Sequence, residues 1–139
     1  MKSDLLSLMR SDTGTLLVEQ LQPATNIWSR FVGLQFRRSL PKTHGVLFVP
    51  CSSIHTMFVR FAIDVYFLTK DGVVAESRRN VQPWKFVLPK HSAHAVLETI
   101  NGAIDLEVGT RLQLNSETGR FPKPLQFLAG NAEQLETQL

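Results

Sequence analysis

Three ionisable residues, His55, Arg60 and Asp64, lie inside the apolar segment SSIHTMFVRFAIDVYFL. A carboxylate that orients an imidazole creates a general base, so Asp64 beside His55 would have that chemistry. On one continuous strand the two residues would be about 30 Å apart, so they can meet only if the chain reverses near Arg60. The same reversal would bring the Arg60 guanidinium to Asp64, and a buried charge needs such a partner. We therefore expect an Arg60–Asp64 ion pair that supports the fold, with ligand contact as the alternative.

Cys51 and the histidines give weaker evidence for chemistry. Cys51 lies four residues before His55, but it follows the apolar run VLFVP, and a reactive thiol needs a nearby cation or helix N-terminus. We expect a buried, inert thiol. His91 and His94 are three positions apart, which on a strand places their rings on opposite faces. Because the sequence also has neither zinc-site spacing nor a glycine-rich phosphate loop, we expect no metal and no cofactor.

Trp84 and Glu98 are two further candidates. Trp84 lies in the segment PWK beside Lys85, a few residues after Arg78 and Arg79. An exposed indole next to cations can stack on a sugar or a base while the cations hold an anionic group. The alternative is that the ring plugs one end of a β barrel. Glu98, in VLETI, is a single carboxylate without an assigned mate, so it is weak evidence for acid–base catalysis.

The basic residues are unevenly distributed, although the formal net charge is only +3. Neither residues 20–63 nor residues 77–97 contain an acidic side chain. Two such segments can form one basic face that attracts an anion or a nucleic-acid backbone. The alternative is a solvated surface that acids from neighbouring elements balance. The predicted basic face consists of Arg37, Arg38, Arg78, Arg79 and Lys85.

Short strands are the elements expected to position these residues. The runs LLSLMR and TLLVEQ flank a turn at Asp12 to Gly14 and predict a hairpin, and Asp71 with Gly72 predicts a second one. The nearly all-apolar run GVLFVPC predicts a strand buried on both faces. Alternate residues of the segment 55–67 are apolar apart from His55, which predicts a strand with one face in the core.

One helix is predicted between the first hairpin and the buried strand. Thr25 can cap it, and Ile27, Phe31 and Leu34 follow at helical spacing before Pro41 ends the element. Together with seven or eight short strands, this helix predicts a mainly β fold. We expect a small β barrel, closed or sandwich-like.

Length and composition fit one domain. The chain has 139 residues, of which 43% are hydrophobic and 19% charged. We expect residues 1–114 to form this domain and residues 115–139 a C-terminal extension that is partly flexible. The single cysteine forms no internal disulfide, and no run approaches the roughly 20 apolar residues that span a bilayer. The N-terminal residues lack the apolar core of a signal peptide, so we expect a cytoplasmic protein without a membrane partner.

Several blocks along the chain are similar to one known family. GLQFRRSLPKTHGVLFV, IHTMFVRFAIDVYFL, DGVV, PW and AVLETINGAIDLEVGTRLQL occur in the order and spacing of the family called domain of unknown function number 192. This resemblance covers residues 25–114 and implies a compact, mainly β domain with one helix. Two positions depart from the family pattern: Gln35 stands where Met is common, and Ala62 where Pro is common. The family has no established biochemistry, so the resemblance implies no activity.

The sequence thus favours a small binding module without an assigned catalytic residue. We expect a groove for an anionic or sugar-like ligand, or for a partner peptide, lined by His55, Arg60, Asp64, Trp84 and Glu98. One alternative is a hydrolase-type enzyme that uses His55 with Asp64 or Glu98. A second alternative is weak nucleic-acid binding through the basic face. The sequence indicates neither the identity of the ligand nor the oligomeric state.

Overall fold

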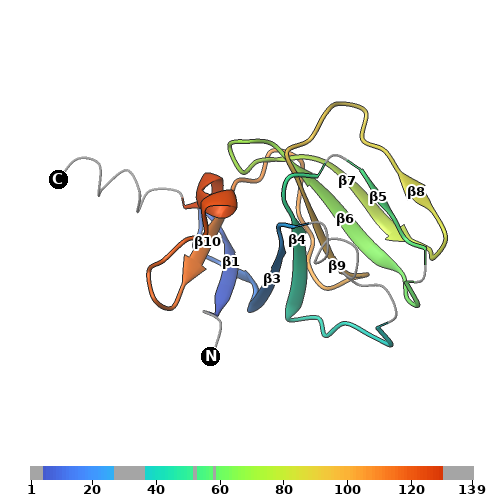
Figure 1. Cartoon of the computed structure of the whole chain (residues 1–139), viewed down its shortest axis with the longest axis horizontal. Helices are drawn as coiled ribbons and strands as arrows, with labels where there is room; N and C mark the ends of the chain where they lie inside the picture. The colour runs from blue at the N-terminus through green and yellow to red at the C-terminus, as the bar shows by residue number, and fades with distance from the viewer. Residues whose placement is uncertain (1–4, 27–36, 52, 58, 130–139) are drawn as a thin grey trace.

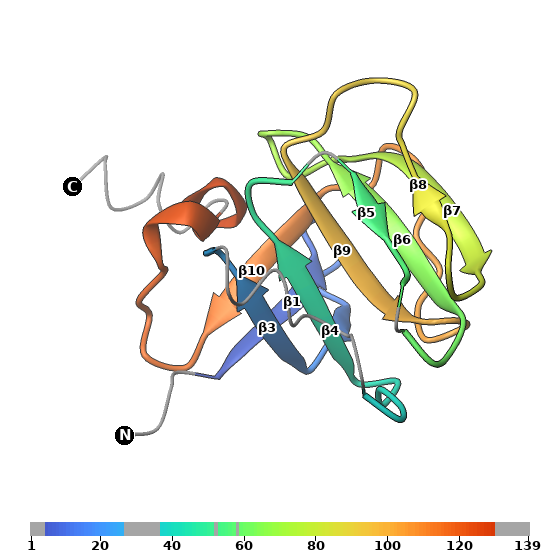
Figure 2. The same ribbon diagram turned by 45° about the vertical axis from the view of Figure 1, so that its right-hand side comes forward.

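A computed structural model describes residues 5–26, 37–51, 53–57 and 59–129, and this part of the chain is mainly β. Three sheets make up the fold (Figures 1 and 2). The elements in chain order are β1 (Leu6–Arg10), β2 (Leu16–Val18), β3 (Gln20–Ala24), β4 (His44–Phe48), β5 (Ile54–His55), β6 (Ile63–Leu68), β7 (Val74–Val81), β8 (Phe86–Val87), β9 (Ala95–Ile100), β10 (Leu112–Ser116) and the 3-10 helix η1 (Lys123–Leu128).

The largest sheet has five strands in the order β3-β4-β9-β6-β7. All neighbours in it are antiparallel except β3 and β4, which are parallel. A three-stranded sheet, β10-β1-β2, and the pair β5-β8 complete the described strands, and β3 lies between β1 and β4 in Figure 1. None of these sheets closes on itself, so the predicted closed barrel is not confirmed. The edge strand β3 carries Pro23, which has no N–H to donate to a further strand.

The structure does not test the predicted helix, and it describes a short helix elsewhere in the chain. The predicted helix with Ile27, Phe31 and Leu34 falls on residues outside the described ranges. The helix that the structure does describe, η1, lies in the C-terminal extension, where Leu125 and Leu128 are fully buried in the core. No helix among the described residues is long and apolar enough to cross a bilayer.

The apolar segment that contains His55, Arg60 and Asp64 is divided into two strands. β5 ends at His55, a turn follows, and β6 begins at Ile63, so the chain does break where a reversal was expected. All six residues of β6 are buried. The prediction of a single strand with one mixed face is therefore wrong, because the five-stranded sheet is covered on both of its faces.

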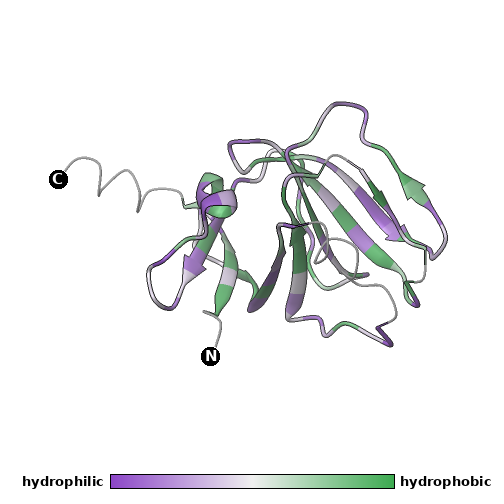
Figure 3. Cartoon of the chain, viewed as in Figure 1, coloured by the Kyte–Doolittle hydropathy of each residue, from purple (hydrophilic) through white to green (hydrophobic). Residues whose placement is uncertain are grey.

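Two apolar clusters cover the two faces of this sheet. Leu97 and Tyr66 belong to the first cluster, which also includes η1, whereas Val96 and Val65 belong to the second. Alternation along β6 and β9 explains the division, because successive side chains point to opposite faces. In Figure 3 the central strands β4 and β9 are largely hydrophobic, and the edge strand β7 is largely hydrophilic.

The predicted hairpins are both present. β1 pairs with β2, and β6 pairs with β7 across the turn at Gly72. Gly72 has φ +77°, and a Cβ built on it would lie 2.9 Å from Leu128 Cδ2 and 3.3 Å from the Leu112 carbonyl oxygen. Gly14, in the β1–β2 turn, has a similar φ of +72°, but a Cβ there would meet no atom within 4 Å. The two glycines thus share a backbone conformation and differ in steric room.

This difference predicts the effect of alanine at each turn. Gly14→Ala should lower the free energy of unfolding by about 1 kcal/mol, because only the left-handed backbone is strained. Gly72→Ala should cost roughly 1–3 kcal/mol more, because the methyl group also displaces a fully buried leucine. Urea unfolding of both variants measures the difference. Equal losses at the two positions would show that the packing of η1 against this turn does not matter.

Candidate functional site

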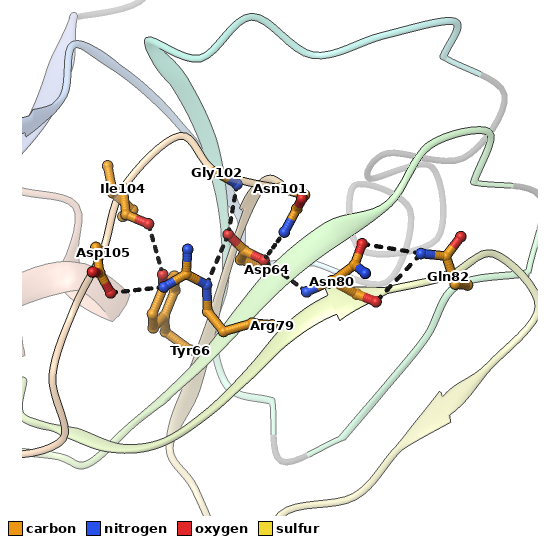
Figure 4. Close-up of polar contacts among 9 residues, drawn as sticks. All are labelled: Asp64, Tyr66, Arg79, Asn80, Gln82, Asn101, Gly102, Ile104 and Asp105. Atoms are coloured by element: carbon orange, nitrogen blue, oxygen red, sulfur yellow. Dashed lines mark hydrogen bonds and ion pairs between the residues drawn. The ribbon is translucent and has the colours of Figure 1, made fainter.

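Asp64 lies at the centre of a buried polar cluster formed by β6, β7 and the loop after β9 (Figure 4). Its carboxylate accepts hydrogen bonds from the backbone N–H groups of Asn80 (2.8 Å) and Gly102 (2.9 Å) and from the side-chain amide of Asn101 (2.8 Å). The Arg79 Nε atom lies 3.1 Å from the second carboxylate oxygen. Asp64 itself is fully buried. Four donors therefore satisfy one carboxylate.

The expected Arg60–Asp64 ion pair is wrong, because Asp64 pairs with Arg79 while Arg60 is exposed. The register of the β6–β7 hairpin explains this choice. Ile63 pairs with Val81 and Val65 with Arg78, so Arg79 and Asn80 both lie opposite the single residue Asp64. Such a bulge redirects the side chains of the longer strand, and Asn80 takes φ +56° there. The partner of Asp64 thus comes from the neighbouring strand.

Two further groups extend the cluster away from Asp64. Arg79 also binds the exposed carboxylate of Asp105 at 2.7 Å. The Tyr66 hydroxyl donates to the Ile104 carbonyl at 3.0 Å, and burial raises the pKa of this phenol above its ordinary value. These contacts hold the loop after β9 against β6. The cluster has the features of a structural framework, because its central carboxylate is enclosed and its oxygens are already engaged.

Glu98 is the second buried carboxyl of the sheet and lies on the face opposite Asp64. Glu98 pairs with Val65 in the β6–β9 register, whereas Asp64 pairs with Thr99, so the two carboxyls point to opposite faces. His55 is exposed on β5, in a different sheet. The structure therefore does not bring His55, Asp64 and Glu98 together, and this geometry gives a hydrolase with these residues no support.

Glu98 lies in the buried part of its face of the sheet. On its face of the sheet, neighbouring strands place Gln22, Val46, Glu98 and Val65 in one row. Glu98 is buried, and the loss of hydration raises its pKa from 4.5 to about 8. This carboxyl group is therefore largely protonated at neutral pH. It lies one strand away from Val46, which lines the cavity described below.

Trp84 is exposed rather than buried at the end of a barrel, so the plug interpretation is wrong. It takes φ +67° in the turn before β8, and its backbone N–H donates a hydrogen bond to the Thr56 carbonyl. Next along the chain, Phe86 pairs with His55, and their two rings meet edge to face at 6.2 Å between centroids. Trp84 and His55 thus lie on the same small sheet, apart from Asp64 and Glu98.

The predicted basic face is only partly a set of exposed cations. Arg78 is ion-paired with Glu76, and Arg79 is held by the two acids described above. Arg38 and Lys85 are exposed, and Arg37 donates to the Gln22 side-chain oxygen.

Cys51 is buried, as expected, and its thiol donates to the Ser53 carbonyl. In the described ranges, no cluster of three or more His, Cys, Asp or Glu side chains could hold a metal ion.

A cavity of about 690 Å³ lies beside the edge strand β3. Its walls come from the start of β1, from β3, from β4 with the chain that leads into it, and from the residues before η1. Its polar lining includes Arg37, His44 and Arg120. Of the residues predicted to bind a ligand, only Arg37 of the basic face lines it. No sequence pattern indicates this site, because its walls come together only in the folded chain.

The enclosed carboxylate of Asp64 predicts a large loss of stability on neutralisation. Asp64→Asn should lower the free energy of unfolding by roughly 3 kcal/mol, because Arg79 loses its buried partner and one amide cannot accept from all four donors. The matched control is Asp105→Asn, which removes the other, largely exposed partner of Arg79 and should cost less than about 0.5 kcal/mol. Thermal and urea unfolding provide the comparison. An Asp64→Asn protein as stable as its parent would contradict the framework.

The raised pKa of Glu98 predicts how stability depends on pH. Above pH 4.5 the unfolded state loses the Glu98 proton, whereas the folded state keeps it. The contribution of the protonated Glu98 to the free energy of unfolding is therefore complete below pH 4.5. It falls as pH rises towards about 8. Up to roughly 4 kcal/mol of stability is at stake over this range. Glu98→Gln should remove the decline, whereas Glu117→Gln, at an exposed acid, should keep it. Urea unfolding at a series of pH values measures both, and parallel profiles for parent and Glu98→Gln would refute the assignment.

Comparison with known proteins places this chain among uncharacterised relatives. A UPF0127 protein from Pyrococcus furiosus is 36% identical over 100 residues, which cover 66% of this chain and 84% of that protein. A second UPF0127 protein, from Thermococcus sibiricus, is 28% identical over 132 residues, covering 87% of this chain and 84% of its own length.

Two solved structures share the fold at low sequence identity. A Sinorhizobium meliloti protein described as a candidate transcription regulator has a TM-score of 0.67 at 21% identity, covering 79% of this chain and 92% of its own. A Novosphingobium aromaticivorans protein of unknown function also has a TM-score of 0.67, at 18% identity, covering 78% and 83%. At the level of the family, residues 9–114 match the model of DUF192, described as an uncharacterized ACR. The chain therefore belongs to the DUF192 family.

Proposed function

We propose that this chain is a binding module for a small organic anion with an apolar body. The observation that carries the proposal is the cavity beside β3, in which cationic side chains stand among apolar walls. A volume of about 690 Å³ is within the range of pockets that enclose small organic ligands.

The charges around the cavity define the ligand class. Arg37, Arg120 and His44 line it, and none of its described lining residues is acidic. A neutral or cationic ligand would leave the two guanidinium groups without a counter-charge. A carboxylate, sulfate or phosphate group can accept paired hydrogen bonds from a guanidinium, which makes an anionic head the matching group.

Apolar side chains complete the walls. Leu21 and Leu40 are buried residues of the two core clusters, and Phe121 packs against the first cluster from the segment before η1. Because burial of apolar surface contributes about 25 cal/mol per Å², a hydrocarbon or aromatic body would add affinity that a bare inorganic anion lacks. The Gln22 side chain also fixes Arg37 by a hydrogen bond, which reduces the entropy lost when an anion binds.

The other two functions expected from the sequence receive less support. Arg78 and Arg79 are already paired with acids, so the basic face has fewer cations for a nucleic-acid backbone. The enzyme alternative needs acid–base groups that converge, and the described residues His55, Asp64 and Glu98 do not. A binding role is compatible with both observations.

Matched probes test the ligand class. We expect 4-phenylbutyrate to raise the melting temperature more than 4-phenylbutanol, and 4-phenylbutylamine to have no effect, because only the carboxylate pairs with the two arginines. A ligand at 100 times its Kd adds about 2.7 kcal/mol of stability, which a thermal-shift assay detects. Equal shifts with the acid and the amine would contradict the proposal.

Arginine variants locate the binding site. Arg37→Ala and Arg120→Ala should each weaken 4-phenylbutyrate binding at least roughly tenfold, the loss expected for a charged hydrogen bond. Arg38→Ala is the control, because Arg38 is the exposed neighbour of Arg37 and does not line the cavity. Isothermal titration calorimetry gives the three dissociation constants. If Arg38→Ala weakens binding as much as Arg37→Ala, the cations act through general charge and not through the cavity.

A further inference from the structure

Three large apolar side chains stand exposed in a row around β8. Trp84 is 61% exposed, Phe86 75% and Leu88 70%. Phe86 and Leu88 flank the buried Val87 at alternate positions, so these two side chains point to the same side. Trp84 lies in the turn just before β8, where it takes φ +67°. The row lies on the β5–β8 sheet, at the outer margin of the molecule in Figures 1 and 2 and away from β3.

The exposure of these side chains indicates the shape of what would cover them. A ring inside a groove is covered by the groove walls, whereas each of these side chains has more than half of its surface in water. We call Trp84, Phe86 and Leu88 the ridge, because these side chains extend into solvent and are not enclosed. Scattered exposed apolar residues are ordinary, but these three lie within one short segment, 84–88, and together they form a patch of the kind that marks an interaction site.

The charges beside the row are positive. Lys85 lies between Trp84 and Phe86, Lys90 follows Leu88 by two positions, and Arg60 is exposed on the loop after β5. Residues 77–97 contain no acid.

One acid does touch this region from a neighbouring strand. The Glu76 carboxylate accepts a hydrogen bond from the Lys90 N–H, and Glu76 is itself ion-paired with Arg78. The apolar row thus has cations beside it, and the nearby Glu76 carboxylate is already paired with Arg78.

We propose that this ridge docks the protein on an anionic lipid surface. Trp84, Phe86 and Leu88 would enter the interfacial region, where aromatic and leucine side chains are favourable, while Lys85 and Lys90 remain at the level of the headgroups. Lysines near an anionic leaflet strengthen the attraction to it. A fluid bilayer accepts a convex ridge without a preformed groove, which is why lipid fits these observations better than a protein partner. The ridge and the cavity are separate surfaces, so this inference does not depend on the proposed ligand.

Vesicle co-sedimentation tests the inference. The full chain should bind vesicles of equal parts phosphatidylcholine and phosphatidylglycerol, and bind vesicles of phosphatidylcholine alone at least several-fold more weakly. Phe86→Ser and Leu88→Ser should each reduce the partition coefficient roughly tenfold, because each substitution removes an inserted apolar side chain. Lys85→Gln should weaken binding only to the anionic vesicles.

The controls are exposed apolar residues elsewhere on the protein. Leu16→Ser and Val108→Ser change similarly exposed side chains on β2 and on the loop before β10, and they should bind vesicles like the parent. Unchanged melting temperatures would show that all variants fold. Binding to neither vesicle, or equal losses in ridge and control variants, would overturn the proposal. So would a concentration-dependent dimer in size-exclusion chromatography that Phe86→Ser abolishes, because the ridge would then bind a second copy of the chain.

Discussion

The buried carboxylate of Asp64 constrains the arrangement of half the main sheet. An ionised group removed from water must have its hydrogen bonds and its charge satisfied within the protein. Here the donors come from β7 and from the loop after β9, and none comes from β6 itself. Meeting this requirement fixes the bulge of β7 at Asn80 and holds Gly102 against the end of β6. Asp64 therefore ties β7 and the loop after β9 to β6, and both of its carboxylate oxygens are engaged by these donors.

The two faces of the main sheet are specialised in different ways. The face of Tyr66 and Leu97 packs against the first apolar cluster, which the C-terminal helix η1 closes. The opposite face carries the row from Gln22 through Val46 to Glu98. Gln22 and Val46 line the cavity, and Glu98, whose pKa is raised to about 8, lies on the next strand. The open end of this row lies beside β3, where the sheet ends and the cavity begins. The cavity thus lies at the edge of the sheet, beside its last strand.

Much of the local structure could be predicted because it depends on neighbouring residues. The turns at Gly14 and Gly72, the buried strand β4 and the break in the chain before Ile63 all follow from alternation and turn chemistry. The ion pair of Asp64 could not be predicted, because a register shift selects Arg79 over Arg60 and no sequence pattern announces that shift. The cavity was missed for a related reason: the arginines that line it are some 80 positions apart and meet only through the tertiary fold.

The two proposed binding surfaces, the cavity and the ridge, both combine apolar side chains with cations, but in different arrangements. Apolar and cationic side chains line the cavity together. On the ridge the apolar side chains are exposed to solvent, and the cations lie beside them. A crystal structure of the full chain with 4-phenylbutyrate tests the central claim most directly. The account predicts electron density in the cavity beside β3, with the carboxylate between Arg37 and Arg120 and with Asp64 still bound to Arg79. Density at Asp64 or on the β5–β8 sheet, with the cavity empty or filled by the chain itself, would contradict it.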